Sequence, residues 1–262
     1  MHNPNADLAT VVADFVAEAE TLYALLHDAD TGYWTEPTNF KAWTVWDVVM
    51  HLHVSDRMAM ASLAGPETFE QAKQTGFKLA DDDTKPTNGP DLLELWHSTL
   101  MELAQKLAAA DPDERFAWFG PGMKAKMFAT ARLMETWAHS WEVFDLMGVQ
   151  KQSGDQIVHI ATIGVRTFGW TFNNRQITVP EPTPYVALSA PSGGDWSWND
   201  ERDDCYVKGD AVEFCQVVTQ VRNVADTQLQ VVGEAAQSWM AIAQCFAGGP
   251  EDPPAPGTRL NL

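Results

Sequence analysis

Apolar side chains recur every three or four residues through residues 7–28, and this spacing constrains the fold more than any other feature of the chain. It is the i, i+3, i+4, i+7 pattern of a helix with one buried face. The positions are Leu8, Val11, Val12, Phe15, Val16, Ala19, Leu22 and Leu26. A helix with such a face must bury it against other elements, so the segment predicts one member of a helical assembly.

A second helix is predicted between Thr44 and Gly65. Thr44 and Asp47 have the spacing of a capping box, in which each side chain accepts a hydrogen bond from the backbone of the other. The apolar run that follows ends at Gly65-Pro66, a pair that stops helices. The polar residues 66–90 carry no such run and predict a long loop.

Two further helices complete the first half of the chain. Pro90 stands where a first helical turn tolerates proline, and apolar residues continue to Leu107 at helical spacing. A fourth helix is predicted from about Phe128 to Met147, stopped by Gly148. Four amphipathic helices predict a four-helix bundle over residues 1–150, a fold whose ligand sites are built from side chains on facing helices.

Residues 151–248 predict a small α+β domain, which makes the whole chain an α+β protein. Residues 185–190 and 196–200 alternate around a turn like a hairpin, and residues 204–209 are typical of a further strand. Helices are predicted near residues 156–170, after Asp210, and over residues 234–249 with a glycine stop. The tail, residues 249–262, predicts a flexible or draped segment.

The net charge and the cysteine content argue against several classes of partner and of site. The formal net charge of -19 and the pI of about 4.5 argue against nucleic acid and anionic membranes as partners, since both require clustered cations. The three cysteines, Cys205, Cys215 and Cys245, include no C-x-x-C pair, so neither a disulfide framework nor a thiolate zinc site is indicated. Without a signal-peptide pattern or a long apolar run, we expect a cytoplasmic protein.

Glu135 and His139 stand four residues apart in the fourth predicted helix. At roughly 100° per residue they lie about 40° apart on one face, one turn from each other. Small and ionisable residues, Arg132 and Glu142 among them, share this face, while bulky apolar residues occupy the other. Two such side chains can grip a metal ion, although pairs at this spacing are also frequent as simple hydrogen-bonded neighbours.

His51 in the second helix strengthens the metal hypothesis because it is embedded in an apolar stretch, where an imidazole needs a partner. His53 lies about 200° around the same helix, next to more polar residues, so His51 is the preferred candidate. Two histidines and one glutamate from facing helices would bind Zn²⁺ or a similar divalent ion and leave an open coordination position. Asp47 either holds the His51 ring or serves only the helix cap.

Two segments resemble the mycothiol-dependent maleylpyruvate isomerase family: WTVWDVVMHL in the second helix and RLMETWAH in the fourth. The likeness continues through GDAVEFCQVVTQVRNVADT and WMAIAQCFAG, so it spans nearly the whole chain. Within that family, the chain resembles an actinobacterial branch. The resemblance implies a DinB-like metal-binding four-helix bundle, followed by a small α+β domain similar in outline to sterol-carrier folds.

The resemblance also implies site residues. His51, Glu135 and His139 match the metal ligands of the family, and Arg222 is the candidate for an arginine that the C-terminal domain contributes. Mycothiol is the implied cosubstrate. This chain has Trp46 where isomerase members commonly show a basic residue, which leaves the small-molecule substrate open.

A metal-bound thiol loses its proton readily, so the predicted function is thiol-dependent isomerisation or S-transfer on a small electrophile. Arg132 and Arg222 are candidates to hold a substrate carboxylate; alternatively, Arg132 pairs with acidic neighbours and Arg222 ends a helix. Trp43, Trp118 and Trp137 either wall the site or belong to the core. Two other functions stay open: a hydrolase or lyase that uses metal-bound water, and a ligand-binding or carrier protein.

Overall fold

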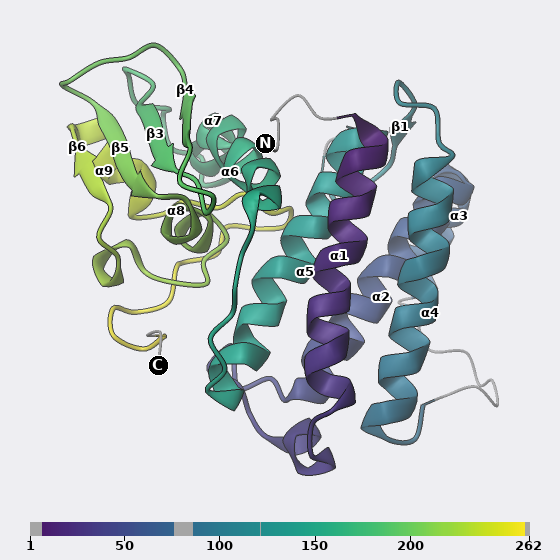
Figure 1. Ribbon diagram of the computed structural model, residues 1–262. Helices are drawn as coiled ribbons and strands as arrows, with labels where there is room; N and C mark the ends of the chain where they lie inside the picture. The colour runs from purple at the N-terminus through teal and green to yellow at the C-terminus, as the bar shows by residue number, and fades with distance from the viewer. Residues whose placement is uncertain (1–6, 76–85, 121, 260–262) are drawn as a thin grey trace. The chain divides into compact units, whose positions relative to one another are not determined.

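The computed structural model describes residues 7–75, 86–120 and 122–259 (Figure 1). Contacts within the chain divide it into two compact units, Asp7–Val149 and a second unit that begins at Gln150. The first is helical and the second combines a sheet with short helices, which confirms the α+β class. Among the described residues, we find no helix with the length and apolar character needed to cross a membrane.

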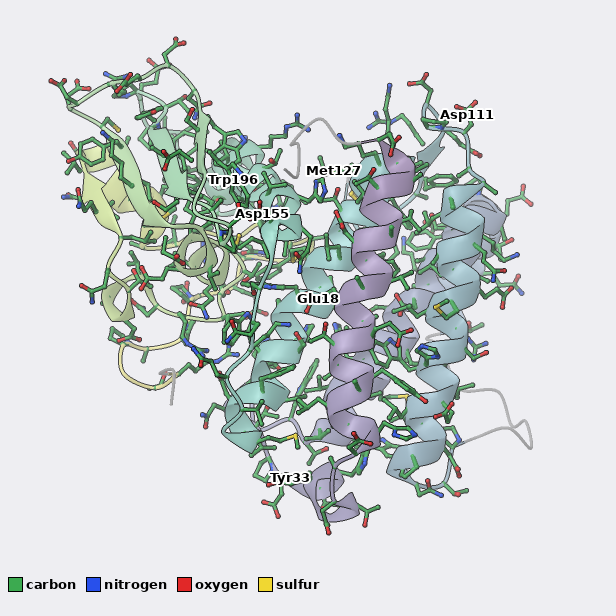
Figure 2. All side chains as sticks on the ribbon, viewed as in Figure 1. Glu18, Tyr33, Asp111, Met127, Asp155 and Trp196 are labelled. Atoms are coloured by element: carbon green, nitrogen blue, oxygen red, sulfur yellow. The ribbon has the colours of Figure 1, made fainter. Side chains whose placement is uncertain are left out.

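Four long helices form the frame of the first unit. They are α1 (Leu8–His27), α2 (Val45–Ala64), α4 (Gly89–Ala108) and α5 (Ala125–Met147). Helices α1 and α2 each pack against both α4 and α5, and their facing side chains fill the space between them (Figure 2). Several charged side chains are buried in this interior, Glu18 of α1 among them. The four helices occupy the segments that the apolar spacing predicts.

The ends of α2 and α5 follow from local chemistry. The Asp47 N–H donates to Thr44 Oγ1 at 3.2 Å and the Thr44 N–H donates to Asp47 Oδ2 at 2.9 Å, so the predicted capping box is confirmed. Helix α5 ends at Gly148, whose φ of 64° lies in the left-handed region that glycine adopts without strain.

The prediction of a loop over residues 66–90 is wrong for its first part, where α3 (Pro66–Thr75) forms. This short helix buries only Phe69 and Ala72, against Met58 and Ala61 of α2. A helix that buries so little is mostly polar, which is why its composition resembles that of a loop. Residues 76–85 of the same segment lie outside the described residues.

Three smaller elements of the first unit were not predicted. A 3-10 turn, η1 (Thr31–Thr35), precedes α2. Two short strands, β1 (Arg115–Phe116) and β2 (Met123–Lys124), pair antiparallel ahead of α5.

The second unit is built on a four-stranded sheet with the order β4-β3-β5-β6. Its strands are β3 (Tyr185–Ser189), β4 (Asp195–Trp198), β5 (Tyr206–Asp210) and β6 (Gln230–Val232). The β3–β4 pair is the predicted antiparallel hairpin, β5 is the predicted further strand and lies parallel to β3, and β6 was not predicted. The helical elements are η2 (Asp155–Ile157), α6 (Val158–Arg166), α7 (Phe168–Asn174), α8 (Ala211–Val218), η3 (Val224–Asp226) and α9 (Glu234–Met240).

Two helix predictions in this unit need correction. The helix expected near residues 156–170 is divided at Thr167, whose hydroxyl donates to the carbonyls of Ile163 and Gly164 at the end of α6. The helix expected over residues 234–249 stops at Met240. Beyond it the chain turns so that the Cys245 N–H donates to the Val218 carbonyl of α8, a contact that a continued helix would forfeit.

Residues 249–259 are draped along the second unit. The Gln220 side chain donates to the Glu251 carbonyl at 2.8 Å, Asn223 donates to the Pro254 carbonyl at 2.8 Å, and the Gly257 N–H donates to Asp226 at 2.9 Å. Of the two expectations for this tail, flexible or draped, the described part has the second arrangement.

Candidate metal centre

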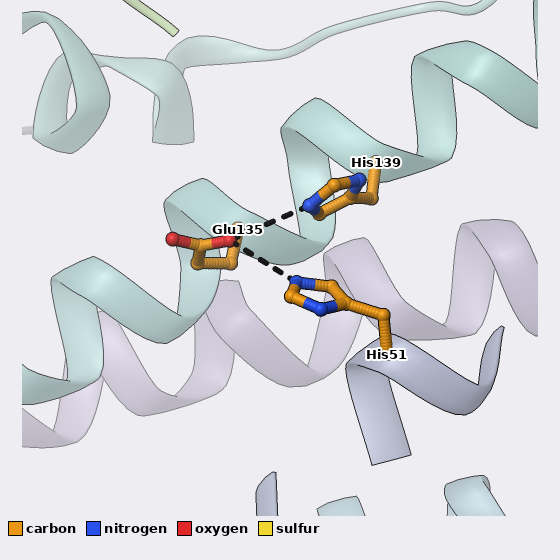
Figure 3. A group of neighbouring side chains, drawn as sticks. All are labelled: His51, Glu135 and His139. Carbon is orange, nitrogen blue, oxygen red and sulfur yellow. Dashed lines mark ion pairs between the residues drawn. The ribbon is translucent and has the colours of Figure 1, made fainter. Parts of the chain in front are cut away.

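Helices α2 and α5 bring His51, Glu135 and His139 together (Figure 3). Nε2 of His51 lies 3.7 Å from Oε2 of Glu135, and Nε2 of His139 lies 3.6 Å from the same oxygen. One donor atom from each side chain lies within 4.8 Å of the other two, and within the described ranges no other group of three such residues meets this spacing. Three electron-pair donors therefore converge from two facing helices.

The donor set fits a divalent cation. Zinc bonds of about 2.0–2.2 Å in tetrahedral geometry place neighbouring ligand atoms roughly 3.3 Å apart, close to the separations of 3.6 and 3.7 Å found here. Nε2 of His51 is buried and has no hydrogen-bond partner among the described residues. A buried polar atom without a partner is costly, and a bound cation would remove that cost.

The site is only partly closed to solvent. The side chains of His51 and Glu135 keep 33% and 24% of their surface exposed, whereas that of His139 keeps 11%. Three protein ligands leave a zinc ion at least one open position, and the exposed side of the cluster lies toward His51 and Glu135. Nε2 of His51 is itself buried, so the exposed surface belongs to other atoms of these side chains.

The three side chains differ in how burial and their neighbours shift their pKa values. Burial opposes ionisation of Glu135, but the nearby rings of His139 and His51 outweigh it and hold the pKa of this carboxyl well below its usual range. Burial lowers the pKa of His51, so this ring is neutral at pH 7. Burial also opposes protonation of His139, yet the carboxylates of Glu142 and Glu135 raise its pKa to about 9. A cation would have to replace the proton on His139.

A tight loop between η1 and α2 covers one side of the histidines. The Thr38 N–H donates to the Trp43 carbonyl at 2.7 Å, and Lys41 and Ala42 adopt left-handed φ values of 50° and 55°. The loop stacks Trp43 on His139 with ring centroids 5.9 Å apart and an interplanar angle of 13°, and sets it 5.2 Å from His51. Non-glycine residues in this conformation are strained, and such strain is common at functional sites.

The other aromatic side chains considered for the site differ in whether they contact its histidines. Phe40 of the same loop meets His139 edge-on at 5.4 Å, a contact that sequence reasoning missed. Of the three tryptophans considered as walls, only Trp43 packs on the ligand rings in the described structure. Trp137 is fully buried beside Trp141, and Trp118 packs against Phe69 and Phe128.

Glu142 is the second side chain that sequence reasoning did not single out. Its Oε1 lies 3.2 Å from Nδ1 of His139, and its side chain is only 3% exposed. The available signal was its position three residues after His139 on the same helical face. Asp47, the acid considered as a support for His51, instead accepts hydrogen bonds from the backbone and hydroxyl of Thr44 in the helix cap.

Arg132 is buried in an ion pair between the two ligand-bearing helices. Its Nε donates to Oδ1 of Asp56 on α2 at 2.9 Å, and the indole of Trp96 donates to the other oxygen at 3.1 Å. The acidic partner is therefore on the facing helix and not on α5 itself. His53 is also buried, and neither of its ring nitrogens has a partner among the described residues.

Arg222, the arginine expected to contribute from the second unit, lies just after α8. Its side chain is buried, and Nη1 donates to the Val221 carbonyl at 3.1 Å. It is therefore part of the turn that follows this helix.

Comparisons with known proteins agree with this architecture. Residues 15–144 match the family model described as the mycothiol maleylpyruvate isomerase N-terminal domain. Two uncharacterized proteins from strains CDC 1551 and H37Rv of Mycobacterium tuberculosis are each 37% identical over 254 residues, which cover 94% of this chain and 98% of the relative.

Two crystal structures share the fold. They are described as the mycothiol-dependent maleylpyruvate isomerase and a mutant of it, and each gives a TM-score of 0.52 with 14% and 13% identity respectively. The alignment covers 83% of this chain and 91% of the other chain in both cases. At this identity the likeness concerns the fold.

Proposed function

Since the chain belongs to the mycothiol maleylpyruvate isomerase family, we propose that it is a metal-dependent enzyme that uses a small thiol of the mycothiol type for isomerisation or S-transfer. The observation that carries the proposal is the convergence of His51, Glu135 and His139, with donor atoms within 4.8 Å of one another. Zn²⁺ is the preferred ion because two imidazoles and one carboxylate form a donor set typical of catalytic zinc.

A divalent cation at this site would lower the pKa of a thiol bound to it, so that the thiolate is available at neutral pH. Glu135 and His51 have the charge states that cation binding requires. Glu135 stays ionised and supplies negative charge, and neutral His51 offers its Nε2 lone pair. The rings of Phe40 and Trp43 keep water away from one side of His139.

The sulfur of the thiolate would be the nucleophile in either proposed reaction. In an isomerisation, the sulfur forms a bond to one carbon of an activated double bond, and the former double bond rotates as a single bond. The sulfur then departs with the bonding electron pair and the double bond re-forms. In an S-transfer the new carbon–sulfur bond is kept, and the electron pair goes to the leaving group or to the opened ring.

A carboxylate on the substrate would need a local cation, because the chain carries a net charge of -19. Arg222 remains our proposed group for this contact. The buried ion pair of Arg132 with Asp56 supports a structural role for Arg132, since a substrate carboxylate would have to compete with Asp56 for its guanidinium.

Calorimetric titration with mycothiol tests the proposal when it is made on metal-loaded protein, metal-free protein and the His51→Ala variant. We expect thiol binding only in the metal-loaded wild type. Metal without thiol affinity would favour a hydrolase or lyase that uses metal-bound water. A purified protein that holds no metal would favour a ligand-binding or carrier protein.

A further inference from the structure

Glu142 stands out among the buried acids of the first unit because it contacts a ring of the candidate metal centre. Its Oε1 lies 3.2 Å from Nδ1 of His139, while Nε2 of the same ring lies 3.6 Å from Glu135. The two nitrogens of one imidazole therefore face two different carboxylates. Glu142 is buried to 3% side-chain exposure, so water competes little for this contact.

An imidazole with a carboxylate at Nδ1 keeps its hydrogen on that nitrogen. The lone pair of the neutral ring is then on Nε2, the atom that points to Glu135 and His51. A hydrogen bond of this kind fixes both the tautomer and the rotation of a metal-binding histidine, and it makes the ring a stronger electron donor.

The two histidines of the site are held in different ways. The His51 ring packs against Trp43 at 5.2 Å, and the acid one turn before it, Asp47, is engaged in the helix cap. His139 also packs on Trp43, but it alone has a buried carboxylate at its second nitrogen. Of the two ligand rings, the one with a buried carboxylate at its second nitrogen is therefore on α5.

We propose that Glu142 is a positioning residue that orients His139 and increases the affinity of the centre for a divalent cation. This role rests on the proposed metal-dependent function. In this role, three side chains at successive turns of one face of α5 contribute to the centre. Glu135 and His139 bind the cation, and Glu142 holds the His139 ring through Nδ1. Burying a carboxylate carries a cost, and the contact of Glu142 with the ring nitrogen of His139 offsets it.

Two substitutions separate the orienting hydrogen bond from the negative charge. Glu142→Gln keeps an acceptor oxygen and removes the charge, whereas Glu142→Met removes both at similar volume. Glu18→Gln is the matched control: Glu18 is also a buried acid facing α5, but it accepts a hydrogen bond from Ser140 Oγ at 3.3 Å (Figure 2). Circular dichroism and thermal unfolding of the metal-free proteins establish that each variant is folded.

Zn²⁺ affinity is measured by chelator competition, and the visible spectrum of bound Co²⁺ reports the ligand geometry. We expect Glu142→Met to bind Zn²⁺ between about tenfold and a hundredfold more weakly, with a smaller loss for Glu142→Gln and an altered Co²⁺ spectrum in both. Glu18→Gln should stay within about twofold of wild type by the same reasoning. If Glu142→Met does not fold, Glu142→Gln decides the question by its affinity and spectrum.

The outcomes separate this role from the proposed function. Folded Glu142 variants with wild-type affinity and spectrum would overturn the role of Glu142 while the metal centre stands. An equal loss in Glu18→Gln would also overturn it, because the effect would then come from burial of charge in general. A wild-type protein that binds neither ion would overturn both.

Discussion

Arg132 of α5 and Asp56 of α2 form an ion pair, Nε to Oδ1 at 2.9 Å, with side-chain exposures of only 2% and 0%. The pair joins the two helices that carry the candidate metal ligands. Removing one member of a buried pair leaves an uncompensated charge, which costs far more than the pair contributes on balance.

We therefore expect Asp56→Leu to lower the free energy of unfolding by about 3–5 kcal/mol. The double variant Asp56→Leu/Arg132→Met should recover most of that loss, because it removes both charges at once. Urea unfolding of the metal-free proteins measures both values. A single variant within about 1 kcal/mol of wild type would show that the pair is not desolvated as the structure indicates.

The capping box of α2 gives a second prediction, which concerns Asp47. Asp47→Ala should lower the free energy of unfolding by about 1 kcal/mol through loss of the cap and leave the Zn²⁺ affinity of the folded protein unchanged. Thr44→Ala, which breaks the same box from the other side, should give a similar loss. A drop in Zn²⁺ affinity confined to Asp47→Ala would instead indicate that Asp47 supports His51.

His53 predicts a pH dependence of stability. Burial first, and then the charge of Arg57, lower the pKa of His53 to about 4, against about 6.5 in an unfolded chain. Between these values only the unfolded state binds the proton, so the contribution of His53 to stability is complete above pH 6.5 and is lost as the pH falls toward 4. A shift of this size corresponds to at most about 3 kcal/mol.

The variant His53→Leu should therefore lose less stability than wild type when urea unfolding is measured at pH 7, 5.5 and 4.5. The comparison with wild type cancels the other groups that titrate in this range. Parallel pH profiles for the two proteins would contradict the assignment of a buried, neutral His53.

Proton release on metal binding gives a fourth prediction. With no cation bound, His139 is protonated below pH 9 because Glu142 and Glu135 raise its pKa, whereas burial keeps His51 neutral at pH 7. Zn²⁺ binding near pH 7.5 should release about one proton, and the apparent affinity should fall about tenfold per pH unit on acidification. Calorimetry in two buffers of different ionisation enthalpy counts the protons, and a count near zero or two would contradict this assignment.

The helical half of the fold was largely predictable because each long helix carries its own signal. The box at Thr44 and the glycine at residue 148 set helix ends through contacts within a few residues. Helix α3 was missed because its stability comes from Phe69 packing on α2, a tertiary contact with no local pattern. In the second unit, the sequence after Tyr185–Ser189 indicates that strands follow, but not that Tyr206–Asp210 joins β3 in parallel.

The candidate site also combines features that local sequence predicts with features that depend on tertiary structure. The spacing of Glu135 and His139 is a property of one helix, but the structure buries His53 more deeply than His51, so the apolar sequence around His51 does not by itself distinguish the two histidines. The contact of Trp43 with His139 depends on the path of a loop with two left-handed residues, which propensity does not reveal. The direction of the Glu142 side chain likewise depends on its rotamer and on its packing.

The central claim is that His51, Glu135 and His139 hold one divalent cation. The most direct measurement is a Zn²⁺ titration of metal-free wild type and of the His51→Ala, Glu135→Gln and His139→Ala variants, with binding followed by chelator competition. We expect one equivalent bound by wild type and a loss of at least about a hundredfold in affinity for each variant, since each removes a ligand or its charge. Undiminished binding in any one of the three folded variants, or no binding by wild type, would contradict the claim.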